Sequence, residues 1–420
     1  MIFFYQILIR LFSFSVGVAS LFNKKAKLFV GGRKNIFIKL KNALSELRTP
    51  DSQLIWFHCS SLGEFEQARP LIEGIRNKVS GIRILITFFS PSGYEVRKKQ
   101  EDADLVFYLP VDTASNVKKF LDIVKPSQAF FVKYDFWYNY LNQLHKRKIP
   151  SYLVSANFRE EQFNGFYGAY LEKVLPFFNF IFVQNESSSK LLAGKNIHNV
   201  IVSGDLRYDR VSQSAINFKK IPLVELFKGE SKLIIGGSTW PEEEAILAGS
   251  DLQRRGIKII IAPHQVDDDH IKKIISLFPD ALRYSVISKE PVSSALGKLQ
   301  SAKVLIIDNI GMLSNLYRYA DVAFVGGGFG AGLHNILEAI AFGVPALFGP
   351  NNSKFPEAGE LITAGGAFEI AEAESFNKTT GFLFSDELIL KMASMTCKNF
   401  IGQKRGAVER ILEKIRSDGK

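Results

Sequence analysis

The sequence predicts an α/β protein with two domains, each organised around a parallel β-sheet. The chain has 420 residues, of which 46% are hydrophobic, and this length suits two or three globular domains. In two separate stretches, short apolar runs alternate with longer amphipathic segments, which is typical of βαβ units around a parallel sheet. Ligands bind at the carboxyl ends of parallel strands. We therefore expect two such domains that face each other across a ligand-binding cleft.

The N-terminal segment predicts a membrane anchor helix over residues 1–22. Between Ile2 and Phe22 the only full charge is Arg10, and the stretch is about as long as a helix that crosses a bilayer. Basic residues follow at once, and positive charge favours the cytoplasmic side: Lys24, Lys25, Lys27, Arg33, Lys34 and Lys39. Because Arg10 interrupts the apolar run, a helix that spans the bilayer and one half-embedded in its surface are both open. A buried core helix is the alternative.

The first alternating stretch predicts an N-terminal domain over residues 40–208. Its apolar runs have the length of buried strands and end in turn residues. The expected strands are 54–57, 82–87, 105–108, 129–132, 152–155, 180–183 and 200–202. Helical patterns lie between most of them, such as 115–123, 136–146 and 187–192.

The second alternating stretch predicts a C-terminal domain over residues 231–385. The expected strands are 233–236, 257–261, 304–307, 322–325 and 346–348, with helices such as 242–253, 270–277 and 335–342. Residues 209–230 lack this alternation, so we expect a linker there. We expect residues 386–420 to form C-terminal helices, and the last of them, 403–418, could return to the N-terminal domain.

Glu64 is the first candidate for a chemical role. The apolar run Leu54–Phe57 predicts a strand, and small and polar residues form a turn before a helical pattern that begins at Glu64. A carboxylate in a first turn is stabilised as the anion by the helix dipole and free N–H groups, by about 0.3–1 kcal/mol when exposed. Glu64 is therefore either an ionised base or a helix cap. The neighbouring His58, at a strand end, is more typical of a structural histidine than of a catalyst, and so is His264.

Glycine-rich turns follow two predicted strands of the second domain. The strand 322–325 leads into five glycines, whose missing Cβ atoms let backbone N–H groups approach a phosphate: Gly326, Gly327, Gly328, Gly330 and Gly332. Asn335 and Glu338 then open a helix, with Glu338 placed to accept hydrogen bonds from sugar hydroxyls. A second turn, Gly236–Thr239, precedes three glutamates, and it is either a helix cap or a second phosphate contact.

Composition narrows the range of partners. Lys and Arg number 53 against 42 Asp and Glu, a net charge of +11, which favours anionic membranes or phosphorylated ligands. No basic run is interleaved with aromatics, so we do not expect nucleic acid as a partner. The two cysteines, Cys59 and Cys397, give neither a disulfide framework nor a CxxC metal pattern. A reducing cytoplasm fits this cysteine content.

Taken together, the motifs resemble those of one family along nearly the whole chain. His58, Ser61, Gly63 and Glu64 match an HxxSxGE motif, and GDLRYD at 204–209 is similar to the family's GNLKFD. Ser238 and Thr239, followed by an acidic pair, match a third motif, and the longest signature runs from Asp308 through HNILEA at 334–339 to GxPxLFGP at 343–350. The basic Gly32–Lys34 after the apolar segment also fits. The chain thus resembles the 3-deoxy-D-manno-octulosonic acid (Kdo) transferases of lipopolysaccharide synthesis.

The resemblance implies a GT-B fold, two Rossmann-like domains across a cleft, and Kdo transfer from CMP-Kdo to the lipid A precursor (lipid IVA) with inversion. It implies no cofactor and no required metal, with CMP-Kdo as a substrate, and a place at the cytoplasmic face of the inner membrane. It makes Glu64 the general base, with Ser61, Gly63 and Asp135 on the acceptor side. The implied donor-binding residues are Arg207, Gly237, Ser238, Thr239, His264, Gly327, Gly328, Gly330, Asn335 and Glu338.

The chain departs from the family pattern in two places. The family's ExExWPN begins with Lys133 here and has Tyr138 in place of proline. Its PRH is Pro263, His264 and Gln265, so an arginine is missing. These changes concern the donor and acceptor contacts, and the base motif is intact. Two other functions stay open: a GT-B transferase with a UDP-sugar donor, and a membrane-anchored binding protein without catalysis.

Overall fold

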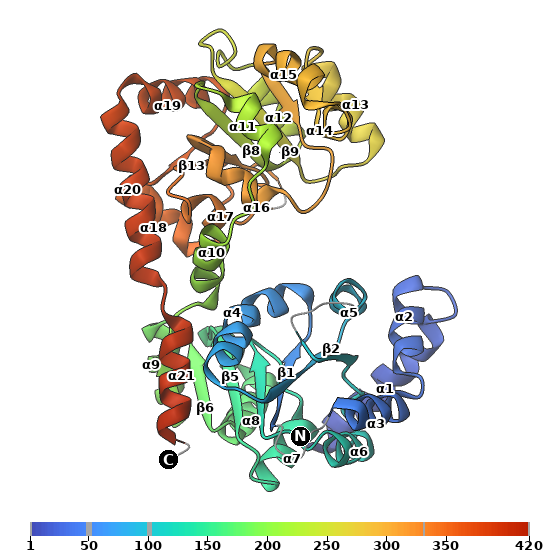
Figure 1. The fold of residues 1–420 in the computed structure, drawn as a ribbon. Coiled ribbons are helices and arrows are strands. Elements are labelled where there is room, and N and C mark those ends of the chain that lie inside the picture. The colour runs from blue at the N-terminus through green and yellow to red at the C-terminus, as the bar shows by residue number, and fades with distance from the viewer. Residues whose placement is uncertain (1, 48–52, 99–102, 331, 419–420) are drawn as a thin grey trace. The chain divides into compact units, whose positions relative to one another are not determined.

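The computed structural model describes residues 2–47, 53–98, 103–330 and 332–418. The chain forms two compact units: residues 1–210 together with 405–420 make unit 1, and residues 211–404 make unit 2. Each unit has a seven-stranded sheet in which all strands are parallel (Figure 1). The fold class that the alternation predicts is therefore confirmed for both units.

The sheet of unit 1 has the strand order β3-β2-β1-β4-β5-β6-β7. The order reverses direction between β1 and β4, so the carboxyl ends of these two strands mark its switch point. The strands are β1 (Gln53–Cys59), β2 (Ile82–Phe88), β3 (Leu105–Tyr108), β4 (Gln128–Val132), β5 (Ser151–Ala156), β6 (Phe180–Val183) and β7 (Val200–Val202).

Helices connect these strands and cover both faces of the sheet. They are α1 (Ile2–Ala19), α2 (Lys24–Arg33), α3 (Ile36–Leu47), α4 (Leu62–Lys78), α5 (Pro91–Arg97), α6 (Ala114–Val124), α7 (Tyr138–Lys146), α8 (Gly165–Val174), α9 (Glu186–Ala193), α10 (Leu206–Ile216) and α21 (Ala407–Asp418), with the 3-10 turns η1 (Glu160–Phe163) and η2 (Leu175–Phe177). α10 crosses the boundary between the units.

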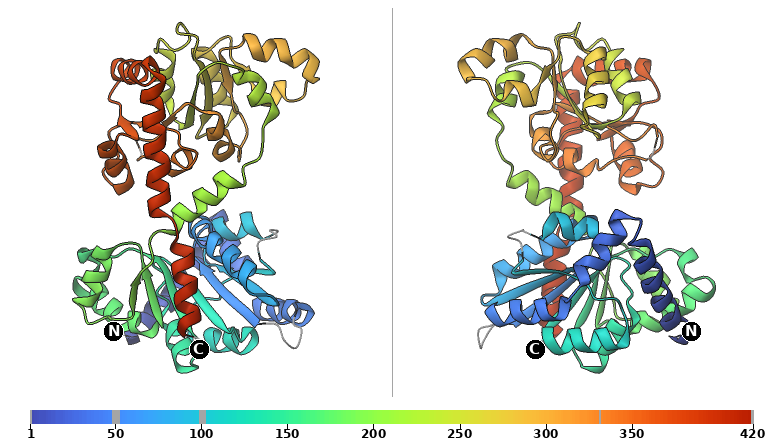
Figure 2. Two further views of the ribbon diagram at one scale, coloured as in Figure 1. Left: turned by 60° about the vertical axis from the view of Figure 1, so that its left-hand side comes forward. Right: turned by 90° about the vertical axis from the view of Figure 1, so that its right-hand side faces the viewer.

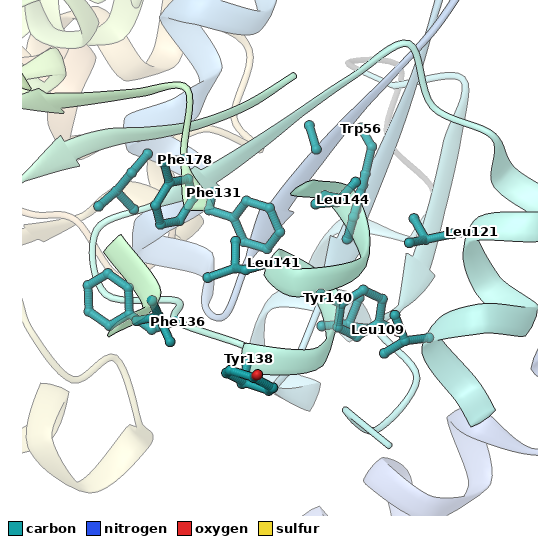
Figure 3. Packing of buried hydrophobic residues seen from close by; sticks show 14 of the residues in the cluster. Trp56, Leu109, Leu121, Phe131, Phe136, Tyr138, Tyr140, Leu141, Leu144 and Phe178 are labelled. Carbon is teal, nitrogen blue, oxygen red and sulfur yellow. The ribbon is translucent and has the colours of Figure 1, made fainter. Parts of the chain in front are cut away.

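The core on one face of this sheet is rich in aromatic side chains (Figure 3). The ring of Trp56 lies 5.3 Å from that of Phe131 and 5.5 Å from that of Tyr140, centroid to centroid. Tyr140, Leu141 and Leu144 bring α7 into this core. Because α7 is held by buried side chains, the loop between β4 and α7 is fixed at the carboxyl edge of the sheet.

The last helix, α21, packs against α4 in unit 1, and Figure 2 shows it running alongside the sheet. Ala407 and Ile411 are buried in the second core cluster of this unit. Asp209 accepts hydrogen bonds from the N–H groups of Gly406 and Ala407, both at 3.0 Å. We expected that the last helix could return to the N-terminal domain. It does so, and its buried side chains belong to the core of unit 1.

The N-terminal helix α1 has one face on unit 1 and one face exposed. Gln6 Nε2 donates to Asn139 Oδ1 at 2.7 Å, the Tyr5 hydroxyl donates to Asp112, and Ile9 is buried. The opposite face carries large exposed apolar side chains: Phe3, Phe4, Ile7, Leu8, Leu11, Phe14 and Val18. By length and composition alone, α1 could cross a membrane.

Arg33, one of the basic residues that follow the apolar segment, is enclosed by the protein. Its guanidinium lies 3.5 Å from the ring centroid of Phe29 and donates to the carbonyls of Leu109 and Phe89, each at 2.8 Å. Burial lowers the pKa of Arg33 to about 9. Arg33 therefore fastens α2 to the sheet, and the remaining lysines supply the exposed positive charge near α1.

The sheet of unit 2 has the order β10-β11-β9-β8-β12-β13-β14, and its switch point lies between β8 and β12. Its strands are β8 (Leu233–Thr239), β9 (Lys258–Pro263), β10 (Leu282–Arg283), β11 (Val304–Ile306), β12 (Val322–Val325), β13 (Ala346–Phe348) and β14 (Ala367–Glu369). Its helices are α11 (Pro222–Lys228), α12 (Pro241–Ala248), α13 (Asp268–Leu277), α14 (Tyr284–Ile287), α15 (Val292–Ser301), α16 (Leu313–Leu316), η3 (Tyr317–Tyr319), α17 (Leu337–Ile340), α18 (Pro356–Ala364), α19 (Ala373–Ser385) and α20 (Glu387–Lys404).

Every strand that the sequence predicts is present, and two further strands, β10 and β14, lie at the two edges of the second sheet. The segment 209–230, where we expected a linker, forms the end of α10 and the helix α11. Val224 and Phe227 of α11 are buried, and Ile221 donates its N–H to the Tyr319 hydroxyl at 2.7 Å. Part of this segment therefore belongs to the body of unit 2.

Candidate active site

Glu64 lies at the carboxyl edge of the first sheet, in the first turn of α4. Ser61 is the N-cap of this helix, and its hydroxyl accepts a hydrogen bond from the Glu64 N–H at 3.4 Å. In return, Glu64 Oε2 accepts from the N–H groups of Ser60 and, at 3.2 Å, of Ser61. This capping box satisfies amides that the helix leaves free. Glu64 therefore caps its helix, and the same bonds fix its carboxylate next to the exposed Gly63.

A second carboxylate, that of Asp135, lies beside Glu64. Asp135 follows β4, the neighbour of β1 in the sheet. The Ser60 N–H donates to Asp135 Oδ2 at 3.1 Å as well as to Glu64, and the Ser60 hydroxyl donates to Asp135 Oδ1. The two carboxylates thus share one amide donor at the switch point, where parallel sheets bind their ligands.

Burial raises the pKa of both carboxyls. Burial first, and then the charge of Glu64, raise the pKa of Asp135 well above its ordinary value. Burial also raises the pKa of Glu64, against the hydrogen bonds from Ser60 and Ser61 and the charge of Lys133. Such a pair titrates as a unit. When this pair carries a negative charge, the carboxylate can accept a proton, as a general base does.

His58 supports this edge as a neutral imidazole. Its Nδ1 lies 2.9 Å from Thr87 Oγ1, and the indole N–H of Trp137 donates to its Nε2 at 3.0 Å. The bond from Trp137 assigns the proton of the ring to Nδ1. Burial lowers the pKa of His58 to about 3. His58 is therefore a structural residue next to Asp135, whose Oδ2 is 3.5 Å from Nε2.

Two cations lie at the same edge of unit 1. Lys133 follows β4 with a φ of 59°, and its half-buried ammonium interacts with Glu64. Burial, and then the charge of Arg207, lower the pKa of Lys133, while Asp205 and Glu64 oppose this. Arg207 opens α10, and its Nε donates to Asp205 Oδ2 at 2.7 Å. The predicted donor contact Arg207 thus shares a unit with Glu64, and a lysine stands beside the candidate base.

In unit 2, the turn after β8 brings Ser238 to the carboxyl edge of the sheet. A Cβ atom on Gly237 would lie 1.9 Å from the Tyr317 hydroxyl, so the position requires glycine. Ser238 has a φ of 53°, in the left-handed region that side chains rarely adopt outside functional sites and turns. Thr239 is fully buried, and its hydroxyl donates to Glu244 Oε1 at 3.0 Å. We predicted that both hydroxyls contact a phosphate. The Thr239 hydroxyl points into the protein, so only the Ser238 hydroxyl stays a candidate for this contact.

The glycine-rich loop after β12 packs closely against neighbouring backbone. A Cβ atom on Gly326 would lie 2.1 Å from the Ser238 carbonyl oxygen, and one on Gly328 would lie 2.5 Å from the Gly349 nitrogen. No side chain fits between backbones this close. Gly326 therefore lets the turns after β8 and β12 approach each other, and Gly328 lets the loop approach the turn after β13.

The N–H groups of Gly327 and Gly330 are engaged within the protein. The N–H of Gly327 donates to Glu243 Oε1 at 2.8 Å, and that of Gly330 donates to the Gly327 carbonyl at 3.2 Å. We predicted that this loop offers free amides to a phosphate. The structure corrects this for these two residues, because each amide already has an acceptor.

Glu243 joins the turn after β8 to the glycine-rich loop after β12. From the sequence we counted it only as one member of an acidic pair and gave it no role of its own. It is fully buried, and its second oxygen accepts from the Trp240 N–H at 2.9 Å. Burial raises the pKa of Glu243, against its hydrogen bonds from Trp240 and Gly327. Its carboxylate therefore holds the start of α12 and the glycine-rich loop in one arrangement.

His264 is stacked between two other rings at this edge. Its ring centroid lies 4.7 Å from that of Trp240 and 4.5 Å from that of His334, with interplanar angles of 22° and 20°. The Trp240 indole N–H donates to His334 Nε2 at 3.1 Å. His264 is exposed, whereas burial lowers the pKa of His334. Sequence reasoning did not select Trp240 and His334, although both stand inside motifs that it quoted.

Asn335 and Glu338 pair at the start of α17. Asn335 Nδ2 donates to Glu338 Oε1 at 3.1 Å, and Asn335 Oδ1 accepts from the Leu337 N–H at 3.2 Å. The predicted helix 335–342 is shorter in the structure, where α17 covers Leu337–Ile340. The amide group of Asn335 thus contacts both the first residue of the short helix and the side chain of Glu338.

The predicted site residues gather in two groups, one on each unit. Unit 1 holds Ser61, Gly63, Glu64, Asp135 and Arg207, and unit 2 holds Gly237, Ser238, Thr239, His264, Gly327, Gly328, Gly330, Asn335 and Glu338. Within the described parts of the chain, no group of three or more His, Cys, Asp or Glu side chains is placed to hold a metal ion. The chemistry of unit 1 is that of a paired carboxylate with two cations near it.

Comparison with known proteins agrees with the resemblance to the Kdo transferases that the motifs predict. Residues 34–210 match the family model described as 3-deoxy-D-manno-octulosonic-acid transferase (kdotransferase). The 3-deoxy-D-manno-octulosonic acid transferase of Haemophilus influenzae is 25% identical over 380 residues, which cover 87% of this chain and 87% of that protein. The enzyme of the same name from Aquifex aeolicus is 27% identical over 338 residues, 78% of this chain and 86% of that protein.

Among solved structures, a putative UDP-N-acetylglucosamine 2-epimerase from Listeria monocytogenes aligns with a TM-score of 0.61, covering 87% of this chain and 96% of that one. At 13% identity this likeness concerns the fold alone. The family match and the two relatives confirm the resemblance that the motifs predict: this is a chain of GT-B-like fold that is similar, along most of its length, to the Kdo transferases, a glycosyltransferase family of lipopolysaccharide synthesis.

Proposed function

We propose that the protein transfers Kdo from CMP-Kdo to the lipid A precursor, lipid IVA, with inversion and without a metal or cofactor. The observation that carries the proposal is the carboxylate pair Glu64 and Asp135, held by Ser60 at a switch point. A sugar hydroxyl is a poor nucleophile near neutral pH, so it needs a positioned base, worth typically 10²- to 10⁴-fold in rate. Glu64 takes that role, and Asp135 lies beside it on the same Ser60 N–H.

The proposed reaction is a single displacement. The acceptor hydroxyl gives its proton to Glu64 as its oxygen attacks the anomeric carbon of Kdo, and the bond from that carbon to the phosphate oxygen of CMP breaks. Because the base activates the hydroxyl directly, no covalent sugar–enzyme intermediate forms, and one displacement inverts the configuration. Ser61 and Gly63 border the acceptor hydroxyl beside Glu64.

The departing CMP carries negative charge, which donors and cations on the protein stabilise. We assign this role to the Ser238 hydroxyl, Arg207 and His264, the last where the family pattern has an arginine. Asn335 and Glu338 bind the nucleotide and its ribose hydroxyls. In the glycine-rich loop, we assign the backbone contact with the phosphate to Gly328, because the N–H groups of Gly327 and Gly330 already donate to acceptors within the protein.

We place the enzyme at the cytoplasmic face of the inner membrane. The exposed face of α1 is apolar along its length, and lysines follow it at 24, 25 and 27. Apolar residues beside positive charge favour binding to an anionic membrane. This location brings the active edge of unit 1 to a lipid acceptor.

Nucleotide selectivity tests the donor. A ligand that binds the folded state stabilises it by RT ln(1 + [L]/Kd), about 2.7 kcal/mol at one hundred times Kd. We expect CMP to raise the melting temperature of the detergent-solubilised protein, and UMP and UDP at equal concentration to raise it far less. A larger shift with UDP would favour a UDP-sugar transferase instead, and equal shifts with all three would contradict a nucleotide-specific site.

A further inference from the structure

A small aromatic cavity in unit 1 opens beside the carboxylate pair. It measures about 190 Å³ and is lined by one residue of α1, four of the loop after β4 and two of α8: Tyr5, Tyr134, Asp135, Phe136, Trp137, Tyr167 and Tyr170. Asp135 is the one carboxyl group among these lining residues. Since Asp135 shares the Ser60 N–H with Glu64, the cavity adjoins the candidate base.

Much of the wall presents carbon surface, because the hydroxyl groups of three of the tyrosines are bonded elsewhere. The Tyr134 hydroxyl donates to the Asn157 carbonyl at 2.7 Å, that of Tyr170 donates to the Phe136 carbonyl, and that of Tyr5 donates to Asp112. These bonds also fix the rings in place. The cavity is therefore apolar on its walls and acidic at one point.

The aromatic walls are flat and arranged in series. The Tyr5 ring stacks on that of Tyr170 with centroids 5.6 Å apart at 16°, and Tyr170 stacks on Tyr167 at 6.3 Å and 23°. Flat aromatic faces match the carbon–hydrogen face of a pyranose ring, while a carboxyl accepts from the hydroxyl or amide groups at its edge. An acyl chain carries no hydroxyl or amide group that could donate to this carboxyl.

The volume supports a single ring. Pockets for drug-sized ligands measure roughly 300–1,000 Å³, and this cavity is smaller. A sugar whose neighbouring hydroxyl is held by Glu64 would place its ring within a few ångströms of that carboxylate. The cavity lies at this position and has the size of one ring.

We propose that this cavity binds a pyranose ring of the acceptor, with Tyr167 as an aromatic platform and Asp135 as the hydrogen-bond acceptor. The proposal rests on the proposed function, because it deepens the acceptor side of the same site. It adds a specificity-determining residue, Tyr167, that no motif marks.

Tyr167 offers a test with a matched control on the same helix. Tyr167 and its neighbour Phe166 are 46% and 58% exposed on α8, and of the two only Tyr167 lines the cavity. We expect Tyr167→Ala to raise the KM for the lipid acceptor about tenfold, with kcat and the KM for CMP-Kdo within about twofold of wild type. Tyr167→Phe keeps the ring face and should restore most of the loss. Phe166→Ala should resemble wild type.

An unchanged acceptor KM in Tyr167→Ala would overturn the proposal. An equal rise in Phe166→Ala would also overturn it, since both residues would then act as a general lipid-facing surface. A binding measurement separates this result from the proposed function. Saturation-transfer NMR with a soluble glucosamine disaccharide should show contact to the ring protons in wild type and Phe166→Ala and loss of contact in Tyr167→Ala, whether or not the protein turns over CMP-Kdo.

The same NMR measurement with decanoate covers the acyl alternative. Signal from decanoate, lost in Tyr167→Ala and absent for the disaccharide, would show an acyl pocket and contradict a sugar subsite. Absence of transfer by wild type, together with disaccharide binding that depends on Tyr167, would contradict the proposed reaction and leave the sugar site standing.

Discussion

Glu64→Gln is expected to lower the transfer rate by two orders of magnitude or more and to leave CMP binding nearly unchanged. Glutamine keeps the shape of the side chain, and its oxygen can still accept from Ser60 and Ser61, but it cannot take a proton. A positioned base contributes about 10²- to 10⁴-fold. Single-turnover transfer from CMP-Kdo measures the chemical step, and calorimetry measures the Kd for CMP.

Glu73→Gln is the matched control for this experiment. Glu73 lies on the same helix, away from the sheet edge, and its carboxylate pairs with Arg69 at 3.1 Å. Its substitution should leave the single-turnover rate within about twofold of wild type. Near-normal chemistry in Glu64→Gln would reduce Glu64 to a helix cap and would contradict the proposed mechanism.

Glu243→Ala is expected to destabilise unit 2 and to weaken CMP binding at least about tenfold. The substitution removes the acceptor of two N–H groups, those of Trp240 and Gly327, and each unsatisfied buried group costs about 1–3 kcal/mol. For a unit of this size, 1 kcal/mol corresponds to about 2–4 °C in Tm. We therefore expect the Tm of unit 2 to fall by roughly 4–24 °C, measured by calorimetry, with CMP affinity measured well below the transition.

Glu242 provides the control for this variant. It stands next to Glu243 in the first turn of α12 and is exposed, so Glu242→Ala changes the charge of the turn without removing the buried acceptor. Its Tm should stay within about 2 °C of wild type. If both variants kept wild-type stability and CMP affinity, the bridge between the two turns would have no role in shaping the donor site.

Most strands could be predicted from the sequence, because buried parallel strands are short apolar runs that are followed by turn residues. Trp56 and Phe57 of β1 are fully buried, as such a run predicts. The missed strands β10 and β14 contain two and three residues and lie at sheet edges, where burial is incomplete. The apolar pattern that predicts a strand is weakest in such short strands at the edge of a sheet.

The candidate site could be predicted from the sequence only in part, because its main contacts join residues that lie far apart in the chain. Glu64 could be placed in a first turn from local pattern. Its proximity to Asp135, 71 residues later, depends on β1 and β4 being neighbours, and strand order is not a local property. The engagement of the Gly327 amide by Glu243 is likewise a long-range contact. The glycines predicted N–H groups that approach a phosphate, whereas in the structure Glu243 accepts from Gly327 and the glycines lie close to neighbouring backbone.

Mass spectrometry of lipid IVA after incubation with the purified protein and CMP-Kdo is the decisive test of Kdo transfer. We expect a product heavier by Kdo, formed equally well after exhaustive chelation of divalent cations and lost in Glu64→Gln. The number of Kdo masses added would follow from the same spectrum. No mass increase with CMP-Kdo under conditions where the protein is folded and binds CMP, or an increase with a UDP-sugar instead, would contradict the account.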